Sequence, residues 1–153
     1  MNKLQGFPKP IKKKKITLKK AKKRLTLKIA KLRAWSAFAL WYRYEVCMAR
    51  AGAALCYTCD NIVPYESIQP GHWMTGHTNT NYINIEYIRP QCKYCNLILK
   101  GNQGIFWERI EAEIGTEKFM YLREHSKDLK EISIQDYLDL EEKCKEMLRS
   151  LQS

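Results

Sequence analysis

The tetrapeptide Cys56-Tyr57-Thr58-Cys59 is followed, 32 residues later, by Cys92-Lys93-Tyr94-Cys95. Two residues separate the cysteines of each pair, so both thiolates of a pair can bind one tetrahedral ion at about 2.3 Å. Two such pairs fill all four positions and leave no place for water, which is typical of a structural rather than a catalytic zinc site. We therefore expect a structural Zn²⁺ ion bound by Cys56, Cys59, Cys92 and Cys95.

The segment between the two pairs is longer than the roughly 15–20 residues of a simple zinc ribbon, so further structure is expected inside the frame. Residues 83–88 alternate apolar and polar side chains and predict a strand, and residues 67–74 are a weaker candidate for its partner strand. Residues 93–100 are predicted to form a short helix that ends at Gly101. The sequence therefore predicts a zinc-stapled ββα unit that depends on zinc binding for much of its folding free energy.

Helical patterns flank this unit. Residues 17–52 contain no proline and no internal glycine, and their apolar side chains recur at helical spacing, which predicts one long helix or two. Beyond the unit, a helix is predicted to end at Gly115, Thr116 is expected to cap the next helix, and Ser133 with Asp136 resembles the capping box of a last helix. The predicted fold class is α+β and mainly helical, with a basic arm (1–16), a basic and aromatic helical segment (17–52), the zinc-bound core (53–104) and C-terminal helices (105–153).

Positive charge is concentrated at the N-terminus. The chain holds 27 Lys and Arg against 16 Asp and Glu, a net charge of +11, and residues 1–44 hold 15 of the basic residues and none of the acidic ones. Lys and Arg release counterions from phosphates, so a nucleic acid is the expected partner, with an anionic membrane or a merely solubilising tail as alternatives. The residues expected to contact nucleic acid here are Lys12, Lys13, Lys14, Lys15, Lys19, Lys20, Lys22, Lys23 and Arg24.

The sequence predicts a cytoplasmic protein without membrane association. No apolar stretch follows the basic N-terminus as in a signal peptide, and no run of about 18 apolar residues is present. Thiols stay reduced in the cytoplasm, which favours metal over disulfides at the paired cysteines. Cys47 and Cys144 stand alone inside helical patterns and are predicted to be buried small hydrophobic residues.

Two polar residues inside the zinc frame are candidates for chemistry. His72 follows Pro70-Gly71 in a strand candidate, and Asn96 comes directly after the second cysteine pair, in the first turn of the predicted helix. A side-chain amide there can offer a hard oxygen to Mg²⁺. Taken alone, each residue could instead have a structural role. The histidine could be a packed side chain, and the asparagine could be a local cap.

Together with the cysteines these residues form a recognisable pattern: Cys56-x-x-Cys59, Gly71-His72-Trp73, Gly76, Asn79, Gln91-Cys92-x-x-Cys95-Asn96 and Lys100-Gly101-Asn102. The pattern resembles the phage NinG (Rap) recombination endonuclease family, within the HNH, or ββα-metal, nucleases with a treble-clef zinc site. The likeness covers residues 25–153 and leaves out the lysine-rich arm. It implies an endonuclease that hydrolyses phosphodiester bonds in branched recombination intermediates such as Holliday junctions and D-loops.

The resemblance also implies roles for single residues. His72 would be the general base, with its second ring nitrogen held by a backbone carbonyl or an Asn oxygen of residues 79–84, and Asn96 would bind the catalytic Mg²⁺ or Mn²⁺. Many relatives have an Asn where this chain has Tyr87, so Asn79 is the first choice for the middle Asn of the HNH pattern and Asn84 the second. Gly71 stands where many HNH enzymes have a metal-binding Asp. Phosphate contacts are expected from His77 and Lys100.

Other interpretations of the sequence remain open at this point. The chain could be a non-catalytic zinc module that binds DNA or RNA, because of the Tyr87 and Gly71 departures, or a zinc-stabilised protein-interaction domain. Metal-dependent nicking separates the first from an enzyme, and salt-dependent DNA binding excludes the second. Symmetric junction cutting would suit a homodimer, and recombination proteins of phage or host are candidate partners.

Overall fold

The computed structural model describes residues 25–128 and 130–152. The predicted arm and the basic residues from Lys12 to Arg24 lie outside these ranges. In chain order the elements are α1 (Leu27–Met48), β1 (Ala53–Leu55), β2 (Ile62–Pro64), β3 (Ile68–His72), α2 (Asn79–Tyr82), the 3₁₀ helix η1 (Ile85–Tyr87), β4 (Ile88–Cys92), the π-helix η2 (Tyr94–Ile98), α3 (Gln103–Ile114), α4 (Thr116–His125) and α5 (Ile134–Gln152). The α+β, mainly helical fold class is confirmed.

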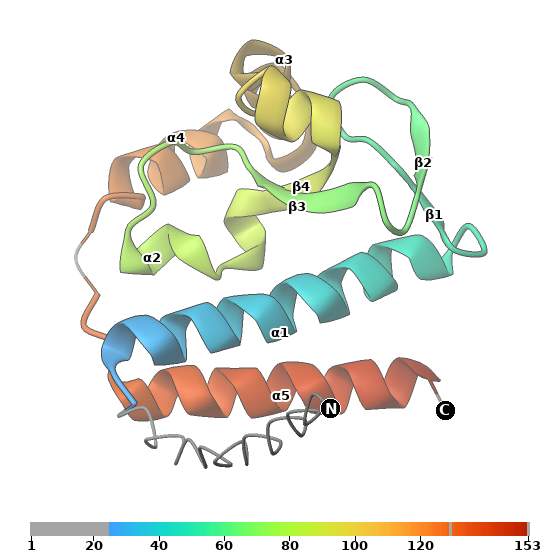
Figure 1. Cartoon of the computed structure of the whole chain (residues 1–153). Coiled ribbons are helices and arrows are strands. Elements are labelled where there is room, and N and C mark those ends of the chain that lie inside the picture. The colour runs from blue at the N-terminus through green and yellow to red at the C-terminus, as the bar shows by residue number, and fades with distance from the viewer. Residues whose placement is uncertain (1–24, 129, 153) are drawn as a thin grey trace, which may run out of the picture.

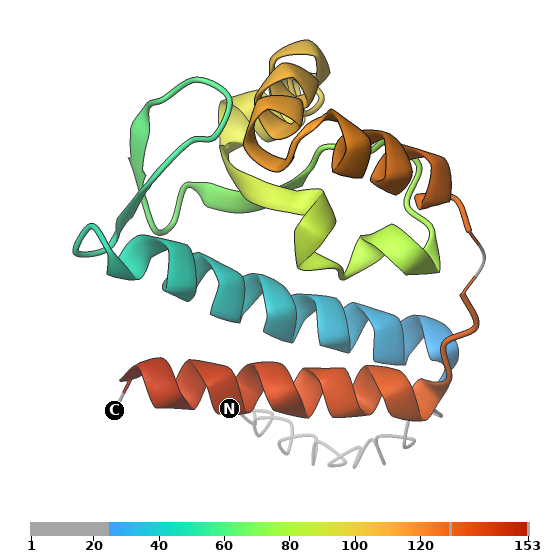
Figure 2. The same cartoon turned by 180° about the vertical axis from the view of Figure 1, so that it is seen from behind.

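The two long helices form one side of the molecule. Figures 1 and 2 show α1 and α5 side by side and running in the same direction, with the β3–β4 ribbon and α2 on the opposite face of α1 and with α3 and α4 beyond them. Within residues 25–128 and 130–152, no helix is long and apolar enough to cross a membrane.

Helix α1 is the central support of the fold. It is a single helix that begins after Thr26, whose side chain accepts a hydrogen bond from the Ile29 amide at 3.3 Å, as expected of an N-cap. The small side chains of Ala30 and Ala34 are fully buried against Tyr137 of α5, which lets the two helices approach closely. Further along, Phe38 and Tyr42 join the core under β4.

The strand predicted at residues 83–88 is wrong. Residues 85–87 form η1, and the strand that pairs with β3 is β4, in an antiparallel register that places Ile68 opposite Cys92 and His72 opposite Ile88. The alternating apolar side chains do not share one sheet face. Ile83 packs against α1 and α5, Ile85 is exposed, and Tyr87 lies in the core around Trp73.

The predicted partner strand is confirmed as β3, within residues 67–74. Its pairing brings Pro70 opposite Pro90. A proline lacks the N–H that a ladder needs, so it is tolerated only where that side of the strand is unpaired, as in this two-stranded ribbon.

The C-terminal helices follow most of the predicted signals. Gly115 has φ +85° and separates α3 from α4. The predicted cap at Thr116 is wrong, because α4 begins at Thr116 itself and the N-cap position belongs to Gly115, which has no side chain to cap the helix. Ser133 and Asp136 exchange hydrogen bonds through the Ser133 amide at 2.7 Å and the Asp136 amide at 3.2 Å, at the start of α5. Cys47 and Cys144 are both buried among apolar side chains, as predicted.

The main core lies between the β3–β4 ribbon and the helices α3 and α4. Trp73 is fully buried there and donates its indole N–H to the Glu86 carbonyl at 2.9 Å. The residues packed around it are Tyr87, Phe106, Ile110, Phe119 and Leu122. Because Trp73 directly follows His72, this packing fixes the end of β3, where the candidate site begins.

Candidate functional site

The four paired cysteines come together at one point. Cys56 and Cys59 lie in the turn between β1 and β2, Cys92 ends β4 and Cys95 lies in η2. Their sulfur atoms all lie within 4.8 Å of one another, and the Cys59 and Cys92 sulfurs are 3.9 Å apart. Tetrahedral zinc with bonds of about 2.3 Å requires sulfur atoms about 3.8 Å apart. The donor set and its spacing therefore fit a structural zinc ion, which these residues could hold.

The thiols differ strongly in acidity. Burial raises the pKa of Cys95 to about 12, whereas at Cys56 burial is outweighed by backbone hydrogen bonds at Cys92 and Thr58, so that its pKa falls to about 6. Four thiolates this close repel one another, and a bound divalent cation favours the ionised form of all of them.

Gln91 connects the zinc frame to the segment after η2. Its side chain is fully buried, and its amide nitrogen donates to the Thr58 hydroxyl at 3.0 Å and to the Gly101 carbonyl at 2.8 Å. A Cβ atom at Gly71 would lie 2.2 Å from the Gln91 Oε1 atom. Glycine is therefore required at position 71 by packing, and the space that an Asp side chain would occupy is filled by Gln91.

His72 is the last residue of β3 and is half-buried. Its Nε2 atom lies 2.9 Å from the carbonyl oxygen of Tyr82, which confirms the expected backbone acceptor in residues 79–84. Because a carbonyl only accepts, Nε2 carries the proton and Nδ1 carries the lone pair. Burial, together with the nearby His77, lowers the pKa of His72 to about 4, and the Tyr82 hydrogen bond opposes this shift. His72 is therefore neutral at pH 7.

Aromatic rings fix the plane of the His72 imidazole. The Trp35 ring of α1 stacks on His72 at a centroid distance of 5.4 Å and on Tyr82 at 4.9 Å. His77 lies against the same imidazole at 4.3 Å. The long helix thus contributes directly to the site, because it supplies the ring that packs against the candidate base.

Asn96 lies in η2 and is oriented by β3. Its amide nitrogen donates to the Oε1 atom of Gln69 at 2.8 Å. Within the described part of the chain its amide oxygen has no hydrogen-bond partner, so this oxygen is available to an external group. The π-helical form of η2 is itself a feature frequently found at functional sites.

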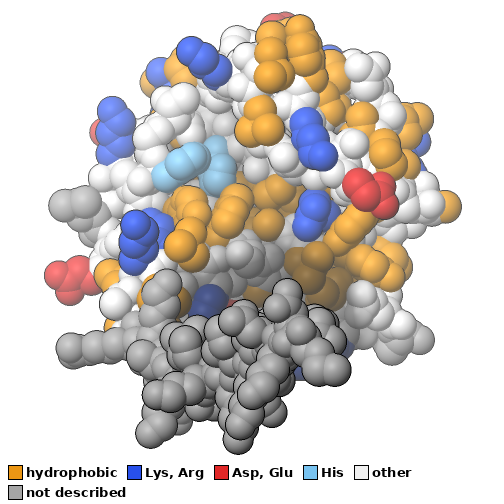
Figure 3. Space-filling view, viewed as in Figure 1, with side chains coloured by type: hydrophobic (Ala, Val, Ile, Leu, Met, Phe, Trp, Pro, Cys, Tyr) orange, Lys and Arg blue, Asp and Glu red, His pale blue; other side chains and the backbone are white. Residues whose placement is uncertain are grey.

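A shallow cavity of about 360 Å³ brings the predicted residues together. His72, His77, Asn96 and Lys100 all line it, with Leu97 and Gln103 among the others. Gln103 donates to the His72 carbonyl at 3.2 Å, and its own amide oxygen is buried without a partner. Figure 3 shows histidine side chains at the surface of this face, with basic side chains nearby. The cavity can thus offer a neutral imidazole, the amide oxygen of Asn96 and an ammonium group, with the unpaired Gln103 oxygen buried beside it.

The model of the family described as "Bacteriophage Lambda NinG protein" matches residues 6–153. The chain belongs to the NinG family. The match extends further than the resemblance over residues 25–153, since it also includes most of the basic arm. No curated protein and no solved structure matches the chain.

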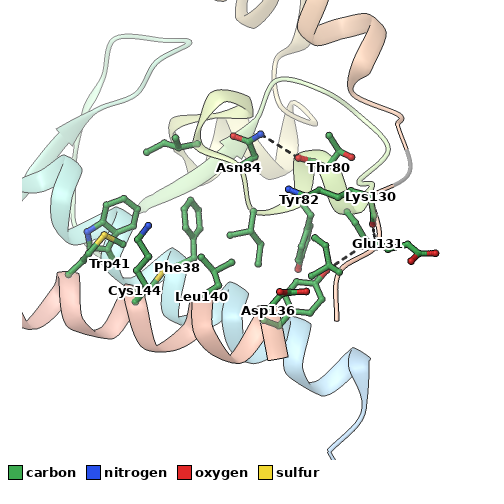
Figure 4. A pocket seen from close by; sticks show the side chains of 17 residues that line it. Phe38, Trp41, Thr80, Tyr82, Asn84, Lys130, Glu131, Asp136, Leu140 and Cys144 are labelled. Atoms are coloured by element: carbon green, nitrogen blue, oxygen red, sulfur yellow. Dashed lines mark hydrogen bonds between the residues drawn. The ribbon is translucent and has the colours of Figure 1, made fainter. Parts of the chain in front are cut away.

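In this NinG family member, the two candidates for the middle Asn lie away from the cavity. The Asn79 oxygen accepts from the Lys31 ammonium at 3.1 Å and from the Tyr137 hydroxyl at 3.3 Å, and the Asn84 oxygen caps η1 through the Glu86 amide at 3.1 Å. Both residues line a different cavity of about 660 Å³ between α2, η1 and α5 (Figure 4). The orienting acceptor for His72 is instead the Tyr82 carbonyl.

Sequence reasoning missed two contributors to the candidate site, Gln69 and Trp35, and left the acceptor for His72 unspecified within residues 79–84. A backbone carbonyl such as that of Tyr82 carries no signal in the sequence. Gln69 and Trp35 could have been found only with the register of β3 and the position of α1 known. Gln69 lies on β3, three residues before His72. Its side-chain oxygen accepts a hydrogen bond from the Asn96 amide nitrogen.

Proposed function

We propose that this NinG family member is a metal-dependent endonuclease that cleaves branched DNA by hydrolysing phosphodiester bonds. The observation that carries the proposal is the state of His72, a neutral imidazole whose Nε2 is committed to Tyr82 while Nδ1 has no protein partner in the described residues. This ring lines the same cavity as Asn96 and Lys100. A positioned, neutral base beside groups that bind anions is what phosphodiester hydrolysis requires.

In the proposed reaction His72 acts as the general base. Its Nδ1 takes a proton from water as the water oxygen forms a bond to phosphorus, and the bond from phosphorus to the 3′ oxygen breaks. The leaving 3′ oxygen takes a proton from solvent water, so the products are a 5′-phosphate end and a 3′-hydroxyl end. Lys100, which is exposed and has no ion pair in the described residues, is placed to contact a phosphate oxygen, and His77 is placed beside it.

A divalent cation fits the polar atoms of the cavity. The Asn96 oxygen is free and the Gln103 oxygen is buried without a partner, and amide oxygens are ligands that Mg²⁺ and Mn²⁺ accept. When bound, such an ion would stabilise negative charge on the phosphate and on the leaving oxygen. Among residues 25–128 and 130–152 no Asp or Glu lines the cavity, so we expect weak metal binding until DNA phosphates add oxygens of their own.

The zinc frame and the ββα arrangement also support the proposal. β3 supplies His72, β4 ends at Cys92 and η2 supplies Asn96, so two strands and a helix carry the base and the metal ligand with the zinc cysteines between them. This arrangement is the one that the HNH, or ββα-metal, resemblance implies. The zinc ion would act as a structural support and take no part in the reaction.

A second function is favoured because none of the described residues that line the cavity is a carboxylate. With amide oxygens only, the chain could bind DNA through its basic residues and its zinc frame without cutting it. Such a protein would show salt-dependent DNA binding and no metal-dependent nicking.

The two functions are separated by incubating the full-length protein with a synthetic four-way junction and a sequence-matched duplex. We expect nicks in the junction with Mg²⁺ or Mn²⁺, none with EDTA, and product ends that DNA ligase reseals because they carry 5′-phosphate and 3′-hydroxyl groups. Tight junction binding without nicking in either metal would establish the non-catalytic alternative.

A further inference from the structure

Several apolar side chains beside the cavity are exposed to solvent. In η2, Tyr94 is 61%, Leu97 is 60% and Ile98 is 67% exposed, and Leu99 and Ile105 follow close by in the chain. Figure 3 shows hydrophobic side chains gathered over the helical segment that holds η2 and the start of α3. Contiguous apolar surface of this kind marks interaction sites, whereas single exposed apolar residues do not.

A bound zinc ion would hold the backbone of Tyr94 rigidly. Tyr94 lies between Cys92 and Cys95, so the ion would fix its backbone on both sides. In the described part of the chain its ring has no aromatic partner and its hydroxyl has no hydrogen bond. Holding a large aromatic ring in water brings no benefit to folding, and a fixed ring loses little conformational entropy when it binds a partner.

The exposed residues adjoin the candidate active site. Leu97 lines the cavity together with His72 and Asn96, and Tyr94 lies less than one helical turn before Leu97. A partner that covers the η2 side chains therefore also reaches the cavity.

The charges around η2 indicate the chemistry of that partner. Lys93 and Lys100 flank the helix, both are exposed, and neither forms an ion pair within residues 25–128 and 130–152. Residues 87–107 contain no Asp or Glu. A second copy of the same surface would bring like charges together. A partner with negative charges beside flat apolar surfaces complements the surface, and DNA with unstacked bases has this character.

We propose that Tyr94, Leu97 and Ile98 form a wedge that stacks on unpaired bases at the branch point of DNA. This inference rests on the proposed function and assigns its selectivity for branched DNA to η2. An intact duplex keeps its base faces stacked, whereas a branch point exposes them at low cost, so the wedge gains contacts only at a branch. Lys93 and Lys100 would hold the flanking phosphates, which places one strand beside His72.

The test uses full-length protein in EDTA, so that binding is measured without cleavage. A four-way junction and a matched duplex carry 2-aminopurine at the branch position, and its fluorescence reports unstacking. We compare wild type with Tyr94→Ser/Ile98→Ser, with Tyr94→Phe, and with Met120→Ser, which removes an apolar side chain that is 53% exposed on α4. Zinc content and thermal unfolding are measured for every variant.

For wild type we expect a rise in fluorescence with the junction and none with the duplex. The double variant should lose roughly 5-fold or more of its junction affinity, because base stacking on an aromatic ring typically contributes that much, and should keep its duplex affinity. Tyr94→Phe and Met120→Ser should behave as wild type, the first because the ring is retained.

An unchanged ratio of junction to duplex affinity in the double variant would overturn the inference. So would sedimentation showing a wild-type dimer that the double variant dissociates, because η2 would then be a self-association surface. A protein that unstacks the junction yet never cuts it with Mg²⁺ would leave the wedge standing and refute the nuclease proposal. Absence of any DNA binding would refute both.

Discussion

Burial and the neighbouring His77 lower the pKa of His72 to about 4, and the Tyr82 carbonyl opposes this shift. In the unfolded chain His72 titrates near 6.5. Between these two values the unfolded state binds more protons, so the free energy of unfolding decreases as the pH is lowered from 6.5 toward 4. The same low pKa keeps the proposed base neutral, and therefore competent, throughout this range.

This pH dependence can be measured by urea unfolding at pH 7 and at pH 5.5. Between these pH values His72 alone should remove about 1 kcal/mol from the free energy of unfolding. His72→Gln cannot titrate, so the variant should lose that much less than wild type, while the contributions of the carboxylates and cysteines cancel in the comparison. Equal losses in the two proteins would show that the folded His72 has an ordinary pKa.

Gly71 is the second residue with a specific prediction. Its Cβ position is occupied by the Gln91 side chain, which is buried and held by two hydrogen bonds and so cannot move cheaply. Gly71→Ala should therefore lower the free energy of unfolding by about 1–3 kcal/mol, as overpacking typically does.

The matched control for Gly71→Ala is Gly104→Ala. Gly104 lies in α3 with nothing within 4 Å of its Cβ position. There alanine should stabilise the helix by roughly 0.5–1 kcal/mol in chemical denaturation. If both substitutions proved neutral, Gln91 would not fill the space over Gly71.

At the residue scale, the sequence predicted those residues whose type and spacing indicate a chemical role. The four cysteines, His72 and Asn96 could be named because their types and separations carry chemistry. The acceptor for His72 could be predicted only as an unspecified group in residues 79–84, since a carbonyl belongs to every residue. Asn79 and Asn84 were chosen by side-chain type, and the structure shows both in other hydrogen bonds.

At the scale of elements, the zinc frame joins the β1–β2 turn to β4 and η2. Because a Cys₄ site contributes to folding directly, Cys92→Ser should lose the zinc ion and the cooperative unfolding of the central segment. Zinc content is measured by metal analysis and cooperativity by thermal unfolding followed by near-UV circular dichroism.

Cys47→Ala is the control for the zinc frame, because Cys47 is equally buried but packs among apolar side chains away from the frame. It should retain one zinc ion per chain and a single transition. A Cys92→Ser protein with full zinc content and an unchanged transition would contradict a Cys₄ site.

The elements themselves were predictable to different degrees. The helices have caps and glycine stops that the sequence displays, as at Ser133 and Gly115. The strand β4 was missed because Pro90 lies in its middle, where a proline argues against a strand. A two-stranded ribbon leaves an unpaired edge that accommodates this proline. The alternation of apolar and polar residues at 83–88 is typical of a strand. In the structure it arises because Ile83 and Tyr87 pack into two different clusters.

At the scale of the whole molecule, the excess positive charge is concentrated at the N-terminal end of the sequence. Residues 1–24 hold 11 of the 27 basic residues and none of the 16 acidic ones, so the rest of the chain is balanced in charge. If the N-terminal basic residues bind DNA, each phosphate contact adds about −0.9 to the slope of log K against log salt.

Deleting residues 1–24 should therefore flatten that slope by roughly 3 or more, measured by fluorescence anisotropy with a duplex between low and moderate salt. The rate of nicking from the preformed complex should change little, because His72 and Asn96 lie in the remaining chain. An unchanged slope would show that residues 1–24 do not contact DNA.

The central claim is that His72 is the base of a phosphodiester hydrolysis. Its most direct test is the single-turnover rate of Mg²⁺-dependent nicking of a four-way junction by wild type, His72→Ala and His125→Ala, the last altering a histidine that bonds the Tyr121 carbonyl on α4. We predict that His72→Ala loses about 10²–10⁴-fold in rate while keeping zinc and junction affinity, and that His125→Ala cuts as wild type. A folded, zinc-containing His72→Ala protein that nicks the junction at the wild-type rate would contradict the account.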